Sequence, residues 1–191
     1  VGWVSDAFGS LQIQMYSDAD FAGCLDTMRS TTGMHTCLTG PGTYFPLSGQ
    51  SKRQGCISQS TTEAELVAAS HALRTSGIPL LQFFDIMFDE TEQESDQRLI
   101  HLVDNQAMIA AIRTGRNPTM RHLSRVHGVC LGFLHEQFSQ KSTAMSYIPT
   151  SKMAADIYTK EFTDSDKWNA LCRQIGLYSA EDIKKGDLLP L

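Results

Sequence analysis

The order in which strand-like and helix-like segments follow one another is the feature that most constrains the fold. Three short strand-like segments come first, at residues 11–16, 33–38 and 44–47. The first alternates apolar and polar residues, which is the period of a strand with one buried face. A Gly-Pro-Gly turn at 40–42 joins the other two, so this part of the chain is predicted to be a meander of short strands.

A long helix is expected to begin near Ser60. Ser60 and Glu63 have the spacing of a capping box, in which the Ser60 hydroxyl accepts from the Glu63 amide and the Glu63 carboxylate reaches back. Gly77 and Pro79 are expected to break or kink this helix, because proline lacks an amide hydrogen and clashes with the preceding turn.

The remaining segments complete one α/β domain. We assign helices at 80–88, 106–113, 123–138, 154–159 and 164–175, strands at 99–103 and 144–148, an acidic solvated loop at 85–96 and a loose tail at 184–191. The resulting order, β-β-β-α-β-α-α-β-α, predicts a mixed sheet with helices packed on its faces.

The composition fits one compact domain with a modest extension. The chain has 191 residues, of which 41% are hydrophobic, and it contains neither an apolar run of membrane-spanning length nor a signal-peptide pattern. It begins with Val1 instead of Met, which suggests a fragment or a processed product. Five scattered cysteines without a CxxC pair argue against a disulfide framework and a zinc site, so we expect a reducing intracellular compartment.

The net charge does not decide whether the chain binds nucleic acid. Its value of −5 argues weakly against a nucleic-acid-binding protein, which usually has a basic surface. If four carboxylates are assigned to metal ions, 16 basic side chains face 17 acidic ones, a net charge of −1. The local distribution of charge therefore has to decide.

Four acidic residues occupy positions from which they can meet. Asp18 is expected at the end of the first strand, Glu65 in the first turns of the long helix, Asp104 where a strand ends and a helix begins, and Asp156 at the start of a helix. Such sheet edges bind ligands in open α/β folds, and carboxylates of this kind suit Mg²⁺ or Mn²⁺. Acidic residues are also common near helix starts because they favour the helix dipole, so spacing alone leaves this convergence open.

Five motifs resemble the ribonuclease H domain of copia-type (Ty/copia, Pseudoviridae) retrotransposon Pol polyproteins. They are YSDADFAG at 16–23, RSTTG at 29–33, STTEAEL at 60–66, VDNQ at 103–106 and ADIYTK at 155–160, in the order and at the spacing of that family. The resemblance runs from about Gln12 to Leu177. It implies a ribonuclease H-like fold, with a five-stranded mixed sheet flanked by helices, over 12–162. Residues 1–11 would then be a linker from an upstream reverse transcriptase region, and 163–191 a C-terminal helix and tail.

The resemblance also implies a catalytic set and a reaction. The family's Asp-Glu-Asp-Asp set, which holds two Mg²⁺ ions with Mn²⁺ as a substitute, maps onto Asp18, Glu65, Asp104 and Asp156. Glu65 is preferred to Glu63 because residues 65–69 resemble the acidic helix start of cellular ribonucleases H. The expected reaction is two-metal-ion hydrolysis of the RNA strand of RNA–DNA hybrids during reverse transcription, leaving 3′-hydroxyl and 5′-phosphate ends.

The same resemblance indicates where the protein works and with what. The expected partners are the RNA–DNA hybrid and the reverse transcriptase domain of the same polyprotein, with no membrane. The expected location is the host cytoplasm, in a virus-like particle, or the nucleus, and not the secretory pathway.

Several positions depart from the family's pattern. The loop at 149–153 lacks the histidine of cellular enzymes, Gly49 replaces a usual Trp, Pro79 interrupts a helix that is normally continuous, and Ser124 replaces an acidic residue. An inactive nucleic-acid-binding module of a decayed element is therefore the alternative function. An integrase or resolvase is the third, which the helix position of Glu65 disfavours.

A further set of polar residues is predicted to contact the substrate. Lys52 and Arg53 precede the catalytic helix, Asn105 and Gln106 follow Asp104, and basic residues cluster near residue 123; the predicted contacts are Lys52, Arg53, Asn105, Gln106, Arg121, His122 and Arg125. They would bind phosphates and 2′-hydroxyls across the minor groove of a hybrid. Solvated surface and helix capping are the alternatives. His71 and His101 are expected to be packed side chains.

Overall fold

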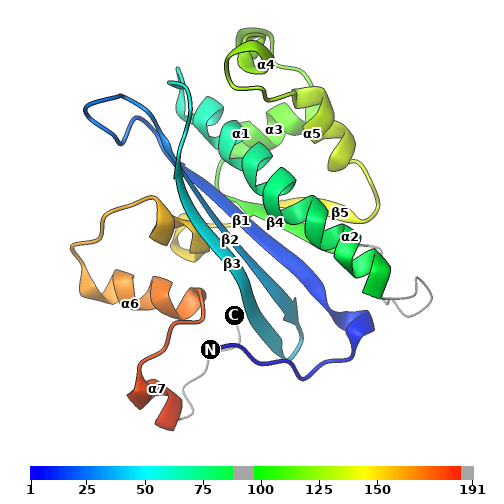
Figure 1. Cartoon of the computed structure of the whole chain (residues 1–191), viewed down its shortest axis with the longest axis vertical. Helices are drawn as coiled ribbons and strands as arrows, with labels where there is room; N and C mark the ends of the chain where they lie inside the picture. The colour runs from blue at the N-terminus through cyan, green and yellow to red at the C-terminus, as the bar shows by residue number, and fades with distance from the viewer. Residues whose placement is uncertain (88–96, 186–191) are drawn as a thin grey trace.

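A five-stranded mixed sheet forms the centre of the protein in the computed structural model, which describes residues 1–87 and 97–185 (Figure 1). The strands are β1 (Gln12–Asp20), β2 (Thr31–Gly40), β3 (Thr43–Arg53), β4 (Leu99–Val103) and β5 (Thr143–Tyr147). They lie in the order β3-β2-β1-β4-β5. The first three are antiparallel, and β4 and β5 run parallel to β1. The predicted α/β class and mixed sheet are confirmed.

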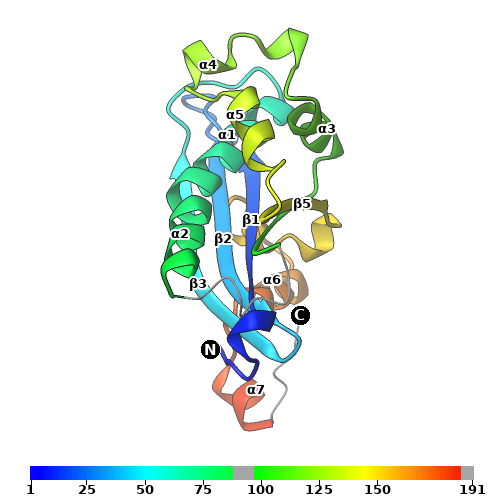
Figure 2. The same ribbon diagram turned by 90° about the vertical axis from the view of Figure 1, so that its right-hand side faces the viewer.

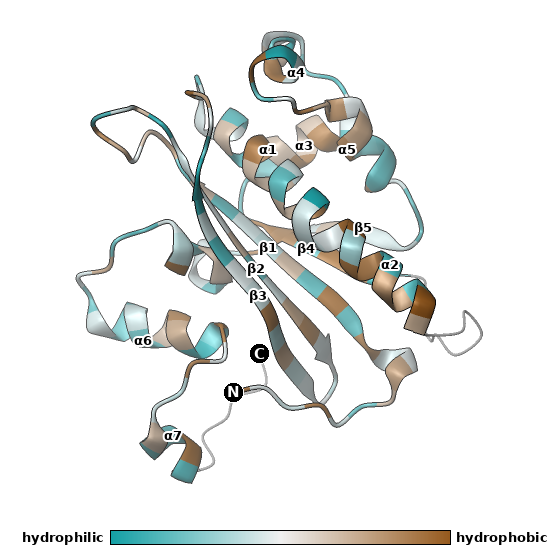
Figure 3. Cartoon of the chain, in the orientation of Figure 1, coloured by the Kyte–Doolittle hydropathy of each residue, from teal (hydrophilic) through white to brown (hydrophobic). Residues whose placement is uncertain are grey.

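The three N-terminal strands are longer than their apolar patterns predict. β1 continues through Ser17 and Asp18, which are polar but buried, so its alternation of hydrophobicity stops before the strand does. The Ser17 hydroxyl is satisfied by His101 Nε2 at 2.8 Å, which removes the cost of burying it. β3 is an edge strand, and its hydrophilic second half lies in solvent (Figure 3).

Helices α1 (Thr61–Ala72) and α2 (Ile78–Met87) follow one another without a loop. The π-helical turn η2 (Leu73–Gly77) joins them, and the backbone stays helical at Ile78. Of the predicted break or kink, the break is therefore wrong: one wider turn accommodates the proline, as π-bulges do in other helices. Residues 85–87 of the predicted acidic loop lie in α2, and its remaining residues, 88–96, lie outside the described part of the chain.

The main core lies between the sheet and the layer formed by α1, α2, α3 (Gln106–Thr114) and α5 (Leu131–Gln137) (Figure 2). Apolar side chains of β1 and β4 meet those of α1 and α3, with Ile13, Leu66 and Leu99 fully buried. Ala64 and Ala68 have no exposed surface either, and their small side chains allow α1 to approach β1 closely. This close approach carries Glu65 towards the end of β1.

The opposite face of the sheet carries η5 (Thr150–Lys152), η6 (Ala154–Tyr158) and α6 (Ser165–Gln174), followed by α7 (Ala180–Lys185). The helix predicted at 154–159 is a 3-10 helix, η6, that contacts β2 most closely. Two glycines make this contact possible. A Cβ at Gly33 would lie 2.6 Å from Thr159 Cγ2, and one at Gly49 would lie 2.0 Å from the Tyr158 hydroxyl oxygen.

The helix predicted at 123–138 is wrong, because the chain turns within it. Two helices, α4 (Leu123–Val126) and α5, are separated by Gly128, whose φ of +67° suits glycine and ends the first helix. The 3-10 helices η1 (Phe8–Ser10) and η4 (Pro118–Met120) complete the description. The predicted loose tail is helical through Lys185, and the remainder lies outside the described residues.

Two further observations complete the fold. Trp3 forms a β-bridge with Tyr44 of β3, so the N-terminal segment packs on the sheet. No helix in the described part of the chain combines the length and the apolar character needed to cross a membrane.

Candidate active site

Three of the predicted acidic residues meet at one edge of the sheet. Asp18, Glu65 and Asp104 come from β1, α1 and the residue after β4, and each offers a carboxylate oxygen within 4.8 Å of the others. Asp18 and Glu65 are buried, and Asp104 is half-buried. They line an open hollow of about 510 Å³, together with Asn105 and Gln106. Asp18 lies inside β1, opposite Gly33, and not at its end as predicted, because the strand continues to Asp20.

The fourth predicted residue, Asp156, lies beside this hollow and is joined to it by Lys160. Lys160 Nζ is 2.7 Å from Asp156 Oδ1 and 3.8 Å from Asp18 Oδ1. Asp156 does not line this hollow but a neighbouring one of about 490 Å³. Lys160 lines both hollows. The structure thus brings the four acids to one region, with an ammonium group between two of them.

Hydroxyl groups hold the carboxylates in place. Thr150 Oγ1 donates to Asp104 Oδ2 at 2.7 Å, and Thr159 Oγ1 donates to Asp18 Oδ2. Asn105 Oδ1 accepts from the Met108 amide at 2.9 Å and so caps α3, while its side chain also lines the hollow. Each fixed carboxylate keeps an oxygen for another ligand.

Burial and mutual repulsion change the ionisation of the site. Burial, followed by the charges of Asp18 and Asp104, raises the pKa of Glu65 to about 9. Burial also raises the pKa of Asp156 to about 6. Glu65 Oε2 is buried and has no hydrogen-bond partner among the described residues. A buried, unpartnered oxygen beside other carboxylates fits a divalent cation, which takes hard oxygen ligands and favours the ionised form.

Glu63 has a different role from Glu65. It is buried on the other side of α1, where its two oxygens lie 2.8 Å from His127 Nε2 and 3.1 Å from His122 Nε2. The Ser60 hydroxyl accepts from the Glu63 amide as predicted, but the carboxylate accepts from the amide of Gln59 and not from that of Ser60. His122, predicted to contact substrate, therefore lies against Glu63.

The predicted basic contacts fall into two places. Lys52 and Arg53 are exposed at the end of β3 and line a groove of about 220 Å³ with His71 and Arg74 of the long helix. Sequence reasoning missed Arg74 and treated His71 as packed. His71 is half-exposed, and its Nε2 lies 2.6 Å from Gln50 Oε1. His71 and Arg74 are three residues apart, which places both on one face of a helix, and this spacing is the signal that could have identified them.

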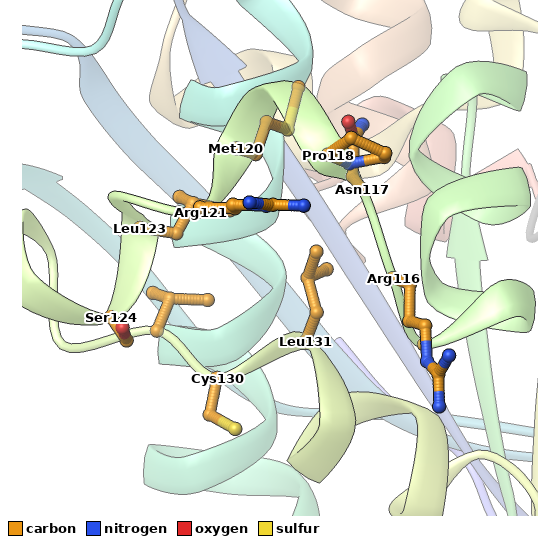
Figure 4. Close-up of a pocket in the computed structure, with 11 residues that line it drawn as sticks. Arg116, Asn117, Pro118, Met120, Arg121, Leu123, Ser124, Cys130 and Leu131 are labelled. Atoms are coloured by element: carbon orange, nitrogen blue, oxygen red, sulfur yellow. The ribbon is translucent and has the colours of Figure 1, made fainter.

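The second place is the segment between α3 and α5. Arg121 is exposed there, and a cavity of about 330 Å³ lies between it and the start of α5. Figure 4 shows Arg121 and Arg116 on different sides of this cavity, with Leu131 between them. Arg125 is exposed on α4. These arginines form a basic surface on the helical side of the molecule.

The remaining expectations concern packed residues. His101 has no exposed surface and stacks on Phe138 at 5.5 Å between ring centroids, so it is packed as predicted. The five cysteines are all free, which agrees with their odd number and scattered positions.

Comparisons with known proteins complete the description of the site. No family model matches the chain. It is 31% identical over 166 residues to the retrovirus-related Pol polyprotein from transposon TNT 1-94 of Nicotiana tabacum, covering 86% of this chain and 11% of that protein. It is also 46% identical over 55 residues to an uncharacterized mitochondrial protein of Arabidopsis thaliana, covering 29% of this chain and 21% of that protein. The chain thus spans a small part of either relative.

Among solved structures, LC11 ribonuclease H1 in complex with an RNA/DNA hybrid superposes with a TM-score of 0.51. The match covers 81% of this chain and 99% of that one at 19% sequence identity. This similarity identifies the fold.

Proposed function

Because the chain is a homologue of one segment of a retrotransposon Pol polyprotein and has the ribonuclease H fold, we propose that it is an endoribonuclease acting on the RNA strand of RNA–DNA hybrids. The observation that carries this proposal is the convergence of Asp18, Glu65 and Asp104 within 4.8 Å, with Asp156 next to them. Acids this close repel one another, and a bound cation removes that repulsion.

We further propose that the four carboxylates hold two divalent ions, Mg²⁺ or Mn²⁺. Glu65 supports this assignment, because one of its oxygens lies within 4.8 Å of the other two acids, and its Oε2 is buried without a hydrogen-bond partner among the described residues. When bound, such a pair supplies Lewis-acid activation of a water and of the scissile phosphate. The residues of the chain contribute position: Thr150 and Thr159 fix the orientation of Asp104 and Asp18, so that their remaining oxygens face one hollow.

The substrate would enter over the hollow. Asn105 and Gln106 line it and offer amide groups to the 2′-hydroxyls that distinguish RNA from DNA. The groove lined by Lys52, Arg53 and Arg74 would bind phosphates of the hybrid on one side of the site. Arg121 and Arg125 would bind phosphates beyond α3, whereas the contact of His122 with Glu63 suits it to holding α4 in place.

The context of the protein follows the same proposal. Residues 12–162 would form the catalytic domain and 163–191 an extension. Residues 1–11 would lead from an upstream reverse transcriptase domain, which would be the partner in the same polyprotein, in the host cytoplasm or nucleus. The β-bridge of Trp3 to Tyr44 would keep this linker attached to the sheet.

Cleavage of a labelled hybrid tests the proposal. The chain with Mg²⁺ or Mn²⁺ is expected to cut the RNA strand, and Asp104→Asn is expected to abolish cleavage while hybrid binding remains. Asp166→Asn is the matched control, because Asp166 is exposed in the first turn of α6. Binding of the hybrid without cleavage by the unmodified chain would support the inactive binding module instead.

A further inference from the structure

Lys160 is an unusual component of a site built to hold cations. Its ammonium lies 2.7 Å from Asp156 Oδ1 and 3.8 Å from Asp18 Oδ1, so it contacts one acid and is close to the other. A lysine that donates a hydrogen bond to a carboxylate carries a full positive charge at neutral pH, so this charge lies beside both acids.

The position of this ammonium is where a shared cation would bind. An ion held by these two carboxylates would lie close to the Lys160 ammonium, which is 2.7 Å from Asp156 Oδ1 and 3.8 Å from Asp18 Oδ1. The two positive charges would repel each other at that separation, so each weakens the binding of the other.

We propose that Lys160 is a positioning residue that occupies the cation position between Asp18 and Asp156 and weakens ion binding there until it moves away. The inference rests on the proposed two-ion site and adds an internal competitor to it. Before metal binds, Lys160 neutralises the repulsion between the two acids and keeps their carboxylates in place. It thereby makes the two ion positions unequal.

The fold provides a route by which Lys160 can leave. Its side chain is 36% exposed, whereas those of Asp18 and Asp156 are 4% and 7% exposed. It lines both the acidic hollow and the neighbouring one, which also contains Thr150 and Phe162. The ammonium can therefore turn towards solvent while the carboxylates, held by Thr159 and by the backbone of η6, stay where they are.

The net charge of the site links binding of the second ion to binding of substrate. Once metal binding has ionised all four carboxylates, they and the Lys160 ammonium carry a net charge of −3. One divalent ion brings this to −1, and a second brings it to +1 if the ammonium remains. A scissile phosphate restores neutrality, so we expect Lys160 to make binding of the second ion depend on substrate.

Mn²⁺ titration without nucleic acid, followed by calorimetry and by the electron paramagnetic resonance of free Mn²⁺, tests this inference. The unmodified chain is expected to bind one ion more tightly than the other. Lys160→Met is expected to tighten the weaker site by roughly ten-fold or more, because a unit charge about 4 Å from a dication repels it strongly even in water. Lys160→Arg, which keeps the charge, is expected to leave the weaker site weak.

Lys152→Met is the matched control, since Lys152 is exposed on η5 and its removal is expected to change neither affinity. If Lys160→Met does not fold, which circular dichroism reveals, Lys160→Gln serves in its place. Equal or weaker binding by the neutral variants would overturn the role of Lys160 and leave the two-ion site intact. If the unmodified chain binds no Mn²⁺, or if Asp104→Asn binds it equally well, the proposed site itself fails.

Discussion

Replacing Gly49 by alanine tests whether the contact between η6 and the sheet controls the position of the candidate site. The new Cβ would lie 2.0 Å from the Tyr158 hydroxyl oxygen and 2.4 Å from its Cζ atom. The oxygen has to move by about 1.4 Å to reach the 3.4 Å of ordinary contact. Tyr158 is adjacent to Thr159 and two residues from Lys160, so this movement displaces groups that face Asp18.

The expected cost has two parts. Overpacking of this contact costs about 1 kcal/mol, the low end of the range for a core, because Gly49 is exposed and Tyr158 is half-buried. Loss of the hydrogen bond between Tyr158 and His35 Nδ1, 3.2 Å long, costs about 1 kcal/mol more. The free energy of unfolding should therefore fall by about 2 kcal/mol, and Tm by roughly 4–8 °C for a chain of this size.

Thermal and urea denaturation measure this effect, with Gly55→Ala as the matched control. A Cβ at Gly55 has nothing within 4 Å, so that variant is expected to be as stable as the unmodified chain. In a Tyr158→Ala background the ring is absent, and Gly49→Ala should cost less than about 0.5 kcal/mol. The reasoning is refuted if Gly49→Ala and Gly55→Ala are equally stable, or if removing the Tyr158 ring does not relieve the cost.

Three other predictions concern the acids and the basic groove. Glu65 has a pKa of about 9 in the folded chain against 4.5 normally, so folding takes up a proton between these pH values and stability falls as pH rises through that window. Glutamine at this position does not titrate, so urea denaturation in EDTA should show Glu65→Gln gaining stability relative to the unmodified chain from about pH 5 to pH 9. A difference in stability that stays constant over this range would contradict the raised pKa. His127→Ala should cost about 1–3 kcal/mol in the same assay, because it removes the partner of Glu63 Oε1, while Oε2 keeps His122 and the Gln59 amide; a loss below about 0.5 kcal/mol would show that the pair is unimportant. The double variant Lys52→Ala, Arg53→Ala should bind the hybrid more weakly, and the slope of log affinity against log salt concentration should fall by the equivalent of about two phosphate contacts. Fluorescence anisotropy at several salt concentrations measures this slope. An unchanged slope would place the substrate elsewhere.

The sequence predicts a strand well where the run is apolar throughout and poorly where it continues into buried polar residues. β4 has the predicted bounds, because Leu99–Val103 is apolar apart from His101 and its alternate residues are buried. β1 extends past its apolar part because Ser17 is paired with His101, a contact between residues far apart in the chain. No local pattern contains that information.

The helix predicted at 123–138 shows a second limit. Its apolar residues fit one helix, but Gly128 adopts a left-handed conformation that ends α4. Glu63 holds the short helix that results, through His122 and His127. Glycine within a helical pattern is tolerated in many proteins, so whether this one breaks the helix depends on tertiary contacts.

In the candidate site, too, local motifs predict some features, and tertiary contacts determine the others. The four acids could be proposed as a site because each stands in a motif of its own, and the proposal needs only that these motifs meet. Lys160 stands in one of those motifs too, and its spacing from Asp156 predicts an ion pair on a helical turn. Lys160 lies close to Asp18, however, only because η6 packs against β2, and a single sequence does not reveal that packing.

The role of Gly49 also depends on a tertiary contact that the sequence does not reveal. Taken alone, glycine in place of a bulky Trp is a loss of packing and suggests a decaying domain. In the structure the Tyr158 ring occupies the space above Gly49, and its hydroxyl is hydrogen-bonded to His35. The glycine and the tyrosine therefore form a complementary pair across the sheet face. Together with Gly33 under Thr159, this pair sets the height of η6 above the sheet and hence the distance from Lys160 to Asp18.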